Sequence, residues 1–229
     1  MRSMIIIAVA ACSITPAADA QDAASGITFD ASAGVVSDYR YRGLSLSDEA
    51  PALQIDATLA TDSGLYANAF ASTIDEYGPG ADGDGAQVEI DYALGWAFSV
   101  MNFDVDLAVS AYTYPGGVDV DYLTVPVAIS RVFESWTLTL GVDYSPSQAN
   151  LGDTDNTYVW LGADWADDDI GYGLAGWIGY ENGAWAPDGK TDWSIGGYKT
   201  VGQFELGLAA QGVDVEDGVN LIGSLMFRS

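Results

Sequence analysis

Apolar and polar residues alternate with a period of two along most of this chain. In residues 88–96, for example, Val, Ile, Tyr, Leu and Trp at even positions alternate with Glu, Asp, Ala and Gly at odd positions. Because successive side chains of a strand point to opposite faces, this pattern predicts strands with two different faces. We predict twelve strands, at residues 27–38, 51–61, 65–74, 86–97, 103–113, 121–130, 136–145, 157–166, 172–180, 191–200, 203–212 and 219–228.

The links between these segments alternate between short and long. The short links are TDSG, FSVMN, RVFES, ADDDIG and VG, and the others are mostly longer and richer in Gly, Asp and Pro. An even number of strands with short turns at one end and longer loops at the other is typical of outer-membrane barrels. The sequence therefore predicts an all-β fold, a single antiparallel up-and-down transmembrane β-barrel of twelve strands. Its short turns would be periplasmic and its longer loops extracellular.

Aromatic residues gather near the ends of the predicted strands. Near the short turns lie Trp96, Phe98, Phe103, Trp136, Trp165, Tyr172 and Phe204, and near the longer loops lie Tyr39, Tyr112, Tyr114, Tyr122, Tyr144, Tyr158, Tyr180 and Trp193. Two aromatic girdles separated by an apolar band are typical of a barrel surface that faces lipid. A β-sandwich would instead bury its aromatic residues in mid-strand, so the distribution favours the barrel.

The charge balance is strongly acidic, with 33 Asp and Glu against 7 Lys and Arg and a formal net charge of −26. This balance argues against nucleic-acid binding, because phosphates need a basic surface. A charge that faces lipid is costly, so the carboxylates on the polar phase of the strands are expected in the lumen. These are Asp56, Glu89, Asp91, Asp104, Asp106, Asp143, Asp164 and Glu205. They either only hydrate the interior or form a pore that attracts cations, and both interpretations stay open.

The first twenty residues have the pattern of a secretory signal peptide. Arg2 supplies the positive charge, Met4–Ala11 the short apolar run, and Ala18-Asp19-Ala20 the cleavage site. We therefore expect a signal peptide at 1–20, a barrel at 21–229, and export to the bacterial outer membrane. Alternatively, the residues that end at Cys12 resemble a lipoprotein cleavage box. Cleavage after Ala20 would remove this cysteine, the only one in the chain, and with it any disulfide.

Candidate catalytic and metal-binding chemistry is scarce. The chain has no histidine and no cysteine beyond the signal peptide, so most nucleophile–base pairs and zinc sites are unavailable. The acidic segments DTDNT and GADGDG do not reproduce the twelve-residue calcium loop with its glycine and final glutamate. We expect neither an enzyme nor a bound metal or cofactor.

Residues 34–72 contain a distinctive run of charged, aromatic and turn-forming residues. It consists of Ser37, Asp38, Tyr39, Arg40, Tyr41, Arg42 and Gly43, then Pro51 at the start of a strand, and then Ser63, Gly64, Leu65 and Tyr66 around a turn. In these residues the chain resembles the TorF family of porin-like proteins. The resemblance implies a bacterial outer-membrane barrel and gives no established substrate.

Arg40 and Arg42 stand two residues apart, so on a strand both would point to the same face, away from lipid. In one interpretation they pair with carboxylates such as Asp38 or Asp56 and fasten the first loop inward. In the other they form one wall of a constriction and create a transverse field that orients solutes.

We expect a porin for passive diffusion of small hydrophilic solutes, with some preference for cations. The alternative is a closed structural or adhesive barrel. The expected partners are outer-membrane lipid, lipopolysaccharide and the barrel-insertion machinery, which would read Phe227 near the end of the last strand. The oligomeric state stays open.

Overall fold

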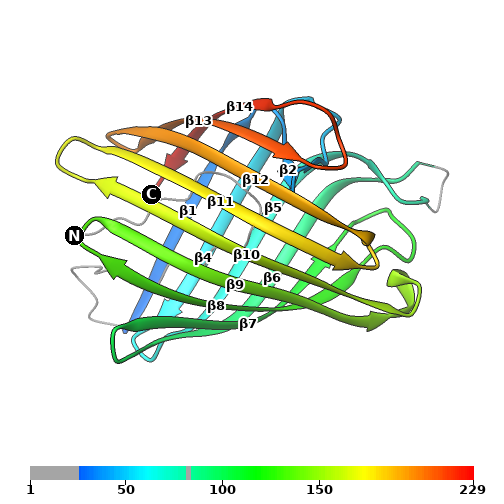
Figure 1. The fold of residues 1–229 in the computed structure, drawn as a ribbon, viewed down its shortest axis with the longest axis horizontal. Coiled ribbons are helices and arrows are strands. Elements are labelled where there is room, and N and C mark those ends of the chain that lie inside the picture. The colour runs from blue at the N-terminus through cyan, green and yellow to red at the C-terminus, as the bar shows by residue number, and fades with distance from the viewer. Residues whose placement is uncertain (1–25, 81–83) are drawn as a thin grey trace.

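The computed structural model describes residues 26–80 and 84–229, which form a closed barrel of antiparallel strands (Figure 1). Each strand pairs with the next along the chain, and the last barrel strand pairs with the first. The prediction of a single twelve-stranded up-and-down barrel is therefore confirmed. The expected signal peptide and Cys12 lie outside the described residues.

The twelve barrel strands are β1 (Ile27–Val36), β4 (Ala52–Thr61), β5 (Leu65–Tyr77), β6 (Ala86–Val100), β7 (Phe103–Thr113), β8 (Tyr122–Phe133), β9 (Trp136–Gln148), β10 (Thr154–Asp167), β11 (Tyr172–Gly183), β12 (Ala186–Val201), β13 (Phe204–Val213) and β14 (Asn220–Arg228). Two short strands, β2 (Arg40–Tyr41) and β3 (Leu44–Ser45), pair in a separate hairpin. The single turn of 3-10 helix is η1 (Ala149–Leu151). Within the described residues, no helix is long and apolar enough to cross a membrane.

The two ends of the barrel differ as the link lengths predict. At one end, here called the short-turn end, tight turns join neighbouring strands. Strand β1 begins at this end and strand β14 ends there (Figure 1). The opposite, long-loop end carries the first loop, residues 37–51. Gly64 shows why one tight turn requires glycine, because its φ is +85° and a Cβ atom would collide with the carbonyl oxygen of Ala97.

One link is shorter than the sequence predicts. We expected strands at 172–180 and 191–200 with ten residues between them. Instead β11 and β12 continue toward each other and leave a turn of two residues, Ala184 and Trp185. Glycines blur the alternation in this region, so the sequence pattern ends before the strands do.

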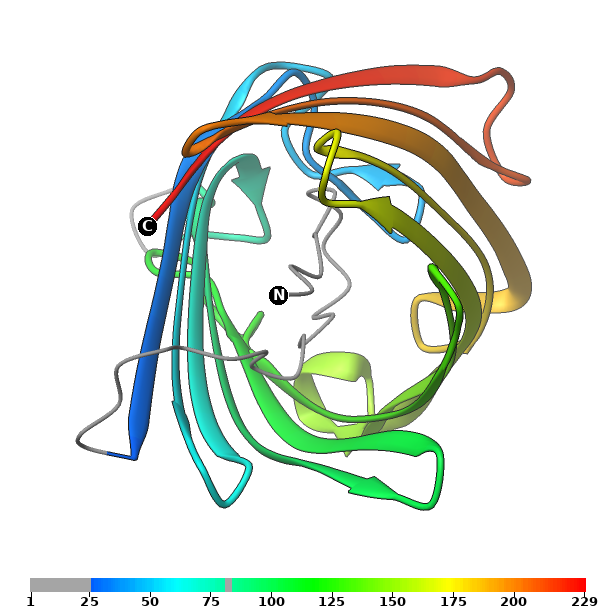
Figure 2. The ribbon, with the colours of Figure 1, turned by 90° about the vertical axis from the view of Figure 1, so that its left-hand side faces the viewer.

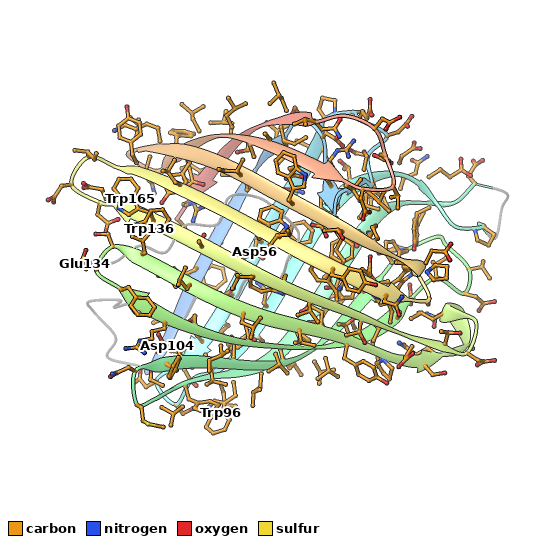
Figure 3. The ribbon with its side chains drawn as sticks, viewed as in Figure 1. Asp56, Trp96, Asp104, Glu134, Trp136 and Trp165 are labelled. Atoms are coloured by element: carbon orange, nitrogen blue, oxygen red, sulfur yellow. The ribbon has the colours of Figure 1, made fainter. Side chains whose placement is uncertain are left out.

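The outer face of the barrel is apolar. The side chains that the alternation places outward are exposed, and Leu94 and Leu161 are 69% and 54% exposed. Trp96, Trp136 and Trp165 lie at the short-turn end in Figure 3, where the sequence predicts one aromatic girdle. A continuous apolar outer surface with a tryptophan rim is what contact with a bilayer requires.

Inside the barrel, aromatic rings lie over glycines of the neighbouring strand. A Cβ atom on Gly95 would collide with the ring of Tyr66, and one on Gly141 would collide with the ring of Trp160. Each ring fills the space that its glycine leaves, and the close approach fixes the register of the two strands. The space left by the missing side chains of Gly95 and Gly141 is therefore filled by rings and does not widen the lumen.

Candidate functional site

The first loop folds inward across the long-loop end of the barrel. Figure 2 looks along the barrel, and this loop, drawn in bright blue, lies within the ring of strands. Tyr39, Arg40 and Arg42 are 2%, 3% and 4% exposed, so these three side chains are buried. Loop residues with such low exposure must be held by contacts with the barrel wall.

The Ser-Asp-Tyr-Arg-Tyr-Arg-Gly motif gives the hairpin its shape. The carboxylate of Asp38 accepts hydrogen bonds from Nε of Arg40 and Oγ of Ser45, both at 2.6 Å. Nη1 of Arg40 donates to the carbonyl oxygen of Gly43 at 2.7 Å, and Gly43 has a φ of +84°. A Cβ atom on Gly43 would lie 2.7 Å from Cβ of Val213, so only glycine fits there. Asp38 therefore stabilises the shape of the loop through these hydrogen bonds and does not line the lumen.

One side of the loop is tethered to β6 through Glu89. The hydroxyl of Tyr39 donates to Oε2 of Glu89 at 2.7 Å. Tyr114 donates to the other carboxylate oxygen, also at 2.7 Å. Because Glu89 is 1% exposed, these hydroxyls replace the water that a carboxylate needs.

The other side of the loop is tethered to β11 through Arg42. Nη1 of Arg42 lies 2.5 Å from Oε1 of Glu181, and Nη2 lies 3.4 Å from Oδ2 of Asp143. Lys190 holds Oε2 of Glu181 at 2.7 Å and also donates to the carbonyl oxygen of Arg42 at 2.9 Å. Burial alone would lower the pKa of Arg42, but Tyr41, Asp143 and Glu181 raise it well above the usual value, so the guanidinium stays charged.

These two tethers span the barrel. In the ring order β11-β10-β9-β8-β7-β6, Glu181 and Glu89 stand on strands five steps apart in a ring of twelve, and so on nearly opposite walls. The start of the loop is fixed to a third place, because the Ser37 N–H donates to the carbonyl oxygen of Gly223 on β14 at 2.8 Å. The loop therefore crosses the lumen and narrows it.

The expectation that both arginines share a face is wrong. Arg42 has a φ of +49°, so the backbone between the two residues is not extended and their side chains diverge. Arg40 turns toward Asp38 and lies 3.5 Å from Glu216 in the loop between β13 and β14. Arg42 pairs with Glu181 rather than with Asp56.

The expected aromatic girdle at the long-loop end lies in part inside the barrel. Five of its eight members are buried, at 2–6% exposure, and they are Tyr39, Tyr112, Tyr114, Tyr122 and Tyr158. Tyr112 and Tyr122 stack with ring centroids 4.6 Å apart, and Trp185 packs edge-on against Tyr122 at the same distance. Tyr144 and Tyr180 remain outside, at 40% and 52% exposure. The buried Tyr112, Tyr114 and Tyr122 pack in one cluster with Tyr39 and Tyr41 of the first loop.

Between the first loop and the short-turn end, the lumen wall carries carboxylates with few partners. Asp56 accepts from Nδ2 of Asn68 at 2.9 Å, and Asp106 accepts from the hydroxyl of Tyr66 at 2.8 Å. Glu205 pairs with Arg228 at 2.8 Å. Buried oxygens of the expected lumen residues that accept no hydrogen bond within the described chain are Oδ1 of Asp91, Oδ2 of Asp106 and Oε2 of Glu205. Asp164 is half-buried and also stands at an inward-facing position of its strand. Asp104 lies at the short-turn end (Figure 3), where the hydroxyl of Ser99 donates a hydrogen bond to it at 2.5 Å.

The basic residues are distributed unevenly among these regions. Arg131 and Lys199 lie over the rings of Phe133 and Tyr172 on the outer face, at 4.7 and 3.9 Å from the ring centroids. Arg40, Arg42 and Lys190 belong to the tethered loop and its wall. Among the described residues, this leaves Arg228 as the one cation facing the short-turn half of the lumen.

Sequence reasoning missed Glu181, Lys190 and Trp185, because all three fell in the expected loop between β11 and β12. A signal was present: Trp177, Gly179 and Glu181 keep the inward phase, and the alternation continues past the glycines. Tyr112 and Tyr114 have even numbers and face inward, whereas Val109 has an odd number and faces outward. Whether a position along the strand is odd or even therefore shows which rings face inward.

Comparisons with known proteins give a family and a fold. A family model described as "Bacterial protein of unknown function (Gcw_chp)" matches residues 20–223. No curated protein matches the chain. The matching family is not the TorF family, and that resemblance stays an expectation. In the described residues, no group of three or more Asp, Glu or Cys side chains is placed to hold a metal ion.

Solved structures of outer-membrane porins share the fold. The KdgM porin has a TM-score of 0.60 at 5% identity, with 87% of this chain and 98% of that chain covered. The KdgM porin in complex with disordered oligogalacturonate gives 0.61 with the same identity and coverage. The COG4313 outer membrane channel from Pseudomonas putida F1 gives 0.50 at 13% identity, with 93% and 99% covered. At these identities the likeness shows the fold alone.

Proposed function

From the premise that this chain belongs to the Gcw_chp family of bacterial proteins of unknown function, we propose that it is an outer-membrane channel for small hydrophilic solutes, with a preference for cations. The barrel is inserted with its short turns in the periplasm and its first loop at the extracellular mouth. Outer-membrane lipid and lipopolysaccharide contact the apolar outer face. The signal peptide at 1–20 directs export and is cleaved, and the barrel-insertion machinery reads the end of β14.

The inward-folded first loop is the observation that carries the proposal. A loop tethered to nearly opposite walls leaves only a narrow passage, so it acts as the constriction of the channel. Arg40 is held within the loop by Asp38, and Arg42 joins the loop to Glu181 and Asp143 on the barrel wall. Solutes that pass this level meet charges of both signs, which favours small polar molecules over apolar ones.

The charge of the lumen supports the preference for cations. Asp56, Asp106 and Asp164 face the short-turn half of the lumen together with the Glu205–Arg228 pair. Fixed negative charge on low-dielectric walls raises the local concentration of cations and repels anions. A polyanion such as the oligogalacturonate in the KdgM complex is therefore a poor solute for this channel.

Planar-bilayer recording of the refolded mature protein tests the proposal. We expect discrete conductance steps and a reversal potential in a KCl gradient that shows cation selectivity. Arg42→Ala, which releases the loop from β11, should raise the conductance of each step. A correctly folded barrel that stays silent, in the wild type and in Arg42→Ala alike, would rule out the channel.

A closed structural or adhesive barrel is the second candidate. It is favoured by the packing of the loop, since Tyr41, Tyr112, Tyr122 and Trp185 pack against one another inside the barrel at the level of the tethers. In that case the wild type would be silent and removal of the tether would open a pore that the native protein never uses. Recording the wild type before the variant separates the two candidates.

A further inference from the structure

The guanidinium of Arg42 sits in a cage on the barrel wall. Two carboxylates contact it, with Glu181 at 2.5 Å and Asp143 at 3.4 Å. Two aromatic rings face it, and the centroids of Tyr158 and Trp185 lie 4.5 and 5.9 Å from its Cζ atom. Carboxylates together with aromatic faces are the groups that bind organic cations in proteins.

The wall holds this cage in place with contacts that do not involve Arg42. Glu181 receives hydrogen bonds from Asn156 at 2.9 Å and from Lys190 at 2.7 Å. The hydroxyl of Tyr158 donates to Asp192 at 3.1 Å, and this bond fixes the ring. The cage is therefore built by strands β9 to β12 and the β11–β12 turn, from residues outside the first loop.

Arg42 is an incomplete match to the cage. Its Nε atom is buried and makes no hydrogen bond with the described residues, although its Nη atoms are well paired. Without Arg42, the partly exposed Asp143 would lose its ion pair, and the buried Glu181 would keep Lys190 as its cation. Removing one partner of an ion pair leaves a charge that is costly to keep unpaired, so the empty cage favours another cation.

We propose that the cage is a binding site for solutes that carry a guanidinium or primary amine, and that Arg42 is its resident internal ligand. An incoming organic cation competes with Arg42 for Glu181 and Asp143, and the first loop is released from β11 when the solute wins. The aromatic walls favour large, weakly hydrated cations over sodium or potassium. The proposal deepens the channel function and, as far as permeation is concerned, rests on it.

Chemical rescue provides the test. Arg42→Ala leaves the cage without its ligand, and free guanidinium chloride at low millimolar concentration replaces the lost group. We expect the melting temperature of refolded Arg42→Ala to rise in a saturable way with guanidinium, and not with sodium chloride at the same ionic strength. Adding Glu181→Gln to this variant should abolish the rise.

Arg40→Ala is the matched control, because it removes a second guanidinium from the same loop but leaves the cage occupied. It should show no rescue. An equal response of Arg40→Ala and Arg42→Ala, or a response that survives Glu181→Gln, would overturn the proposal. If Arg42→Ala does not refold, Arg42→Gln takes its place.

Melting experiments need no current, so they separate this proposal from the channel function. In bilayers, guanidinium should also reversibly lower the current through Arg42→Ala, while sodium should not. A wild type that conducts, together with an Arg42→Ala that shows neither rescue nor block, refutes the cage and leaves the channel intact. Rescue in a protein that never conducts retains the cage as a binding site and rules out the channel.

Discussion

Replacing Tyr39 by phenylalanine removes one hydroxyl from the first loop and leaves the ring in place. The hydroxyl donates a 2.7 Å hydrogen bond to Glu89, which is 1% exposed. Leaving a buried acceptor without its partner costs about 1–3 kcal/mol, and about 1.4 kcal/mol changes an equilibrium tenfold. Release of the loop from β6 should therefore become about 5- to 140-fold more favourable.

Hydrogen exchange of backbone amides, followed by mass spectrometry on the refolded protein, measures this release. Two amides report on it: Leu46 N–H donates to the carbonyl oxygen of Tyr39, and Asp75 N–H donates to that of Leu46, both at 2.7 Å. Amides that exchange through local opening exchange faster in proportion to the opening equilibrium. We expect both to exchange faster in Tyr39→Phe.

Tyr114→Phe is the matched control. It removes the other hydroxyl bound to Glu89, at the same 2.7 Å, from a residue outside the first loop. The exchange of the two reporter amides, of Leu46 and Asp75, should change little in this variant. Unchanged exchange in Tyr39→Phe would refute the tether, and an equal rise in both variants would assign the effect to Glu89 itself.

Three further predictions concern the outer face, the strand register and the lumen charge. Leu161→Arg puts a charge on the outer face, where Leu161 is 54% exposed, and should lower stability in vesicles by about 2–4 kcal/mol, as measured by urea unfolding. Leu161→Ala is the control, and equal losses would contradict a lipid-facing position. Gly95→Ala forces a methyl group into the ring of Tyr66 and should cost about 1–3 kcal/mol. Gly223→Ala is the control, because its methyl group would meet no atom within 4 Å and should leave stability unchanged. Identical unfolding midpoints for Gly95→Ala and Gly223→Ala would exclude the contact between the Tyr66 ring and Gly95. Asp106→Asn with Asp164→Asn should shift the reversal potential toward zero in a KCl gradient, and Asp168→Asn in a short turn should not. An unshifted double variant would show that these carboxylates do not set selectivity.

The architecture of the barrel follows from local features of the sequence. Val88, Glu89 and Ile90 alternate between side chains that avoid water and side chains that prefer it. In a strand, successive side chains point to opposite faces, so this alternation alone assigns each residue to a face. Even strand number, short turns and the tryptophan rim at the short-turn end follow from the same pattern. Where glycines weaken the alternation, as in residues 172–180, the predicted strand ends are wrong although the strands exist.

The chemistry of the site depends on which residues meet around a closed ring, and the sequence does not contain that information locally. Arg42 and Glu181 are 139 positions apart, and they meet because the barrel closes and the first loop turns inward. The left-handed backbone at Arg42 sends it away from Arg40, and no pattern of alternation predicts this. Periodicity thus determines the strands and their two faces, because each side chain's preference for a polar or an apolar environment is a local property. Only the tertiary structure decides which buried charges are paired, because pairing depends on distances between segments that the chain brings together when it closes.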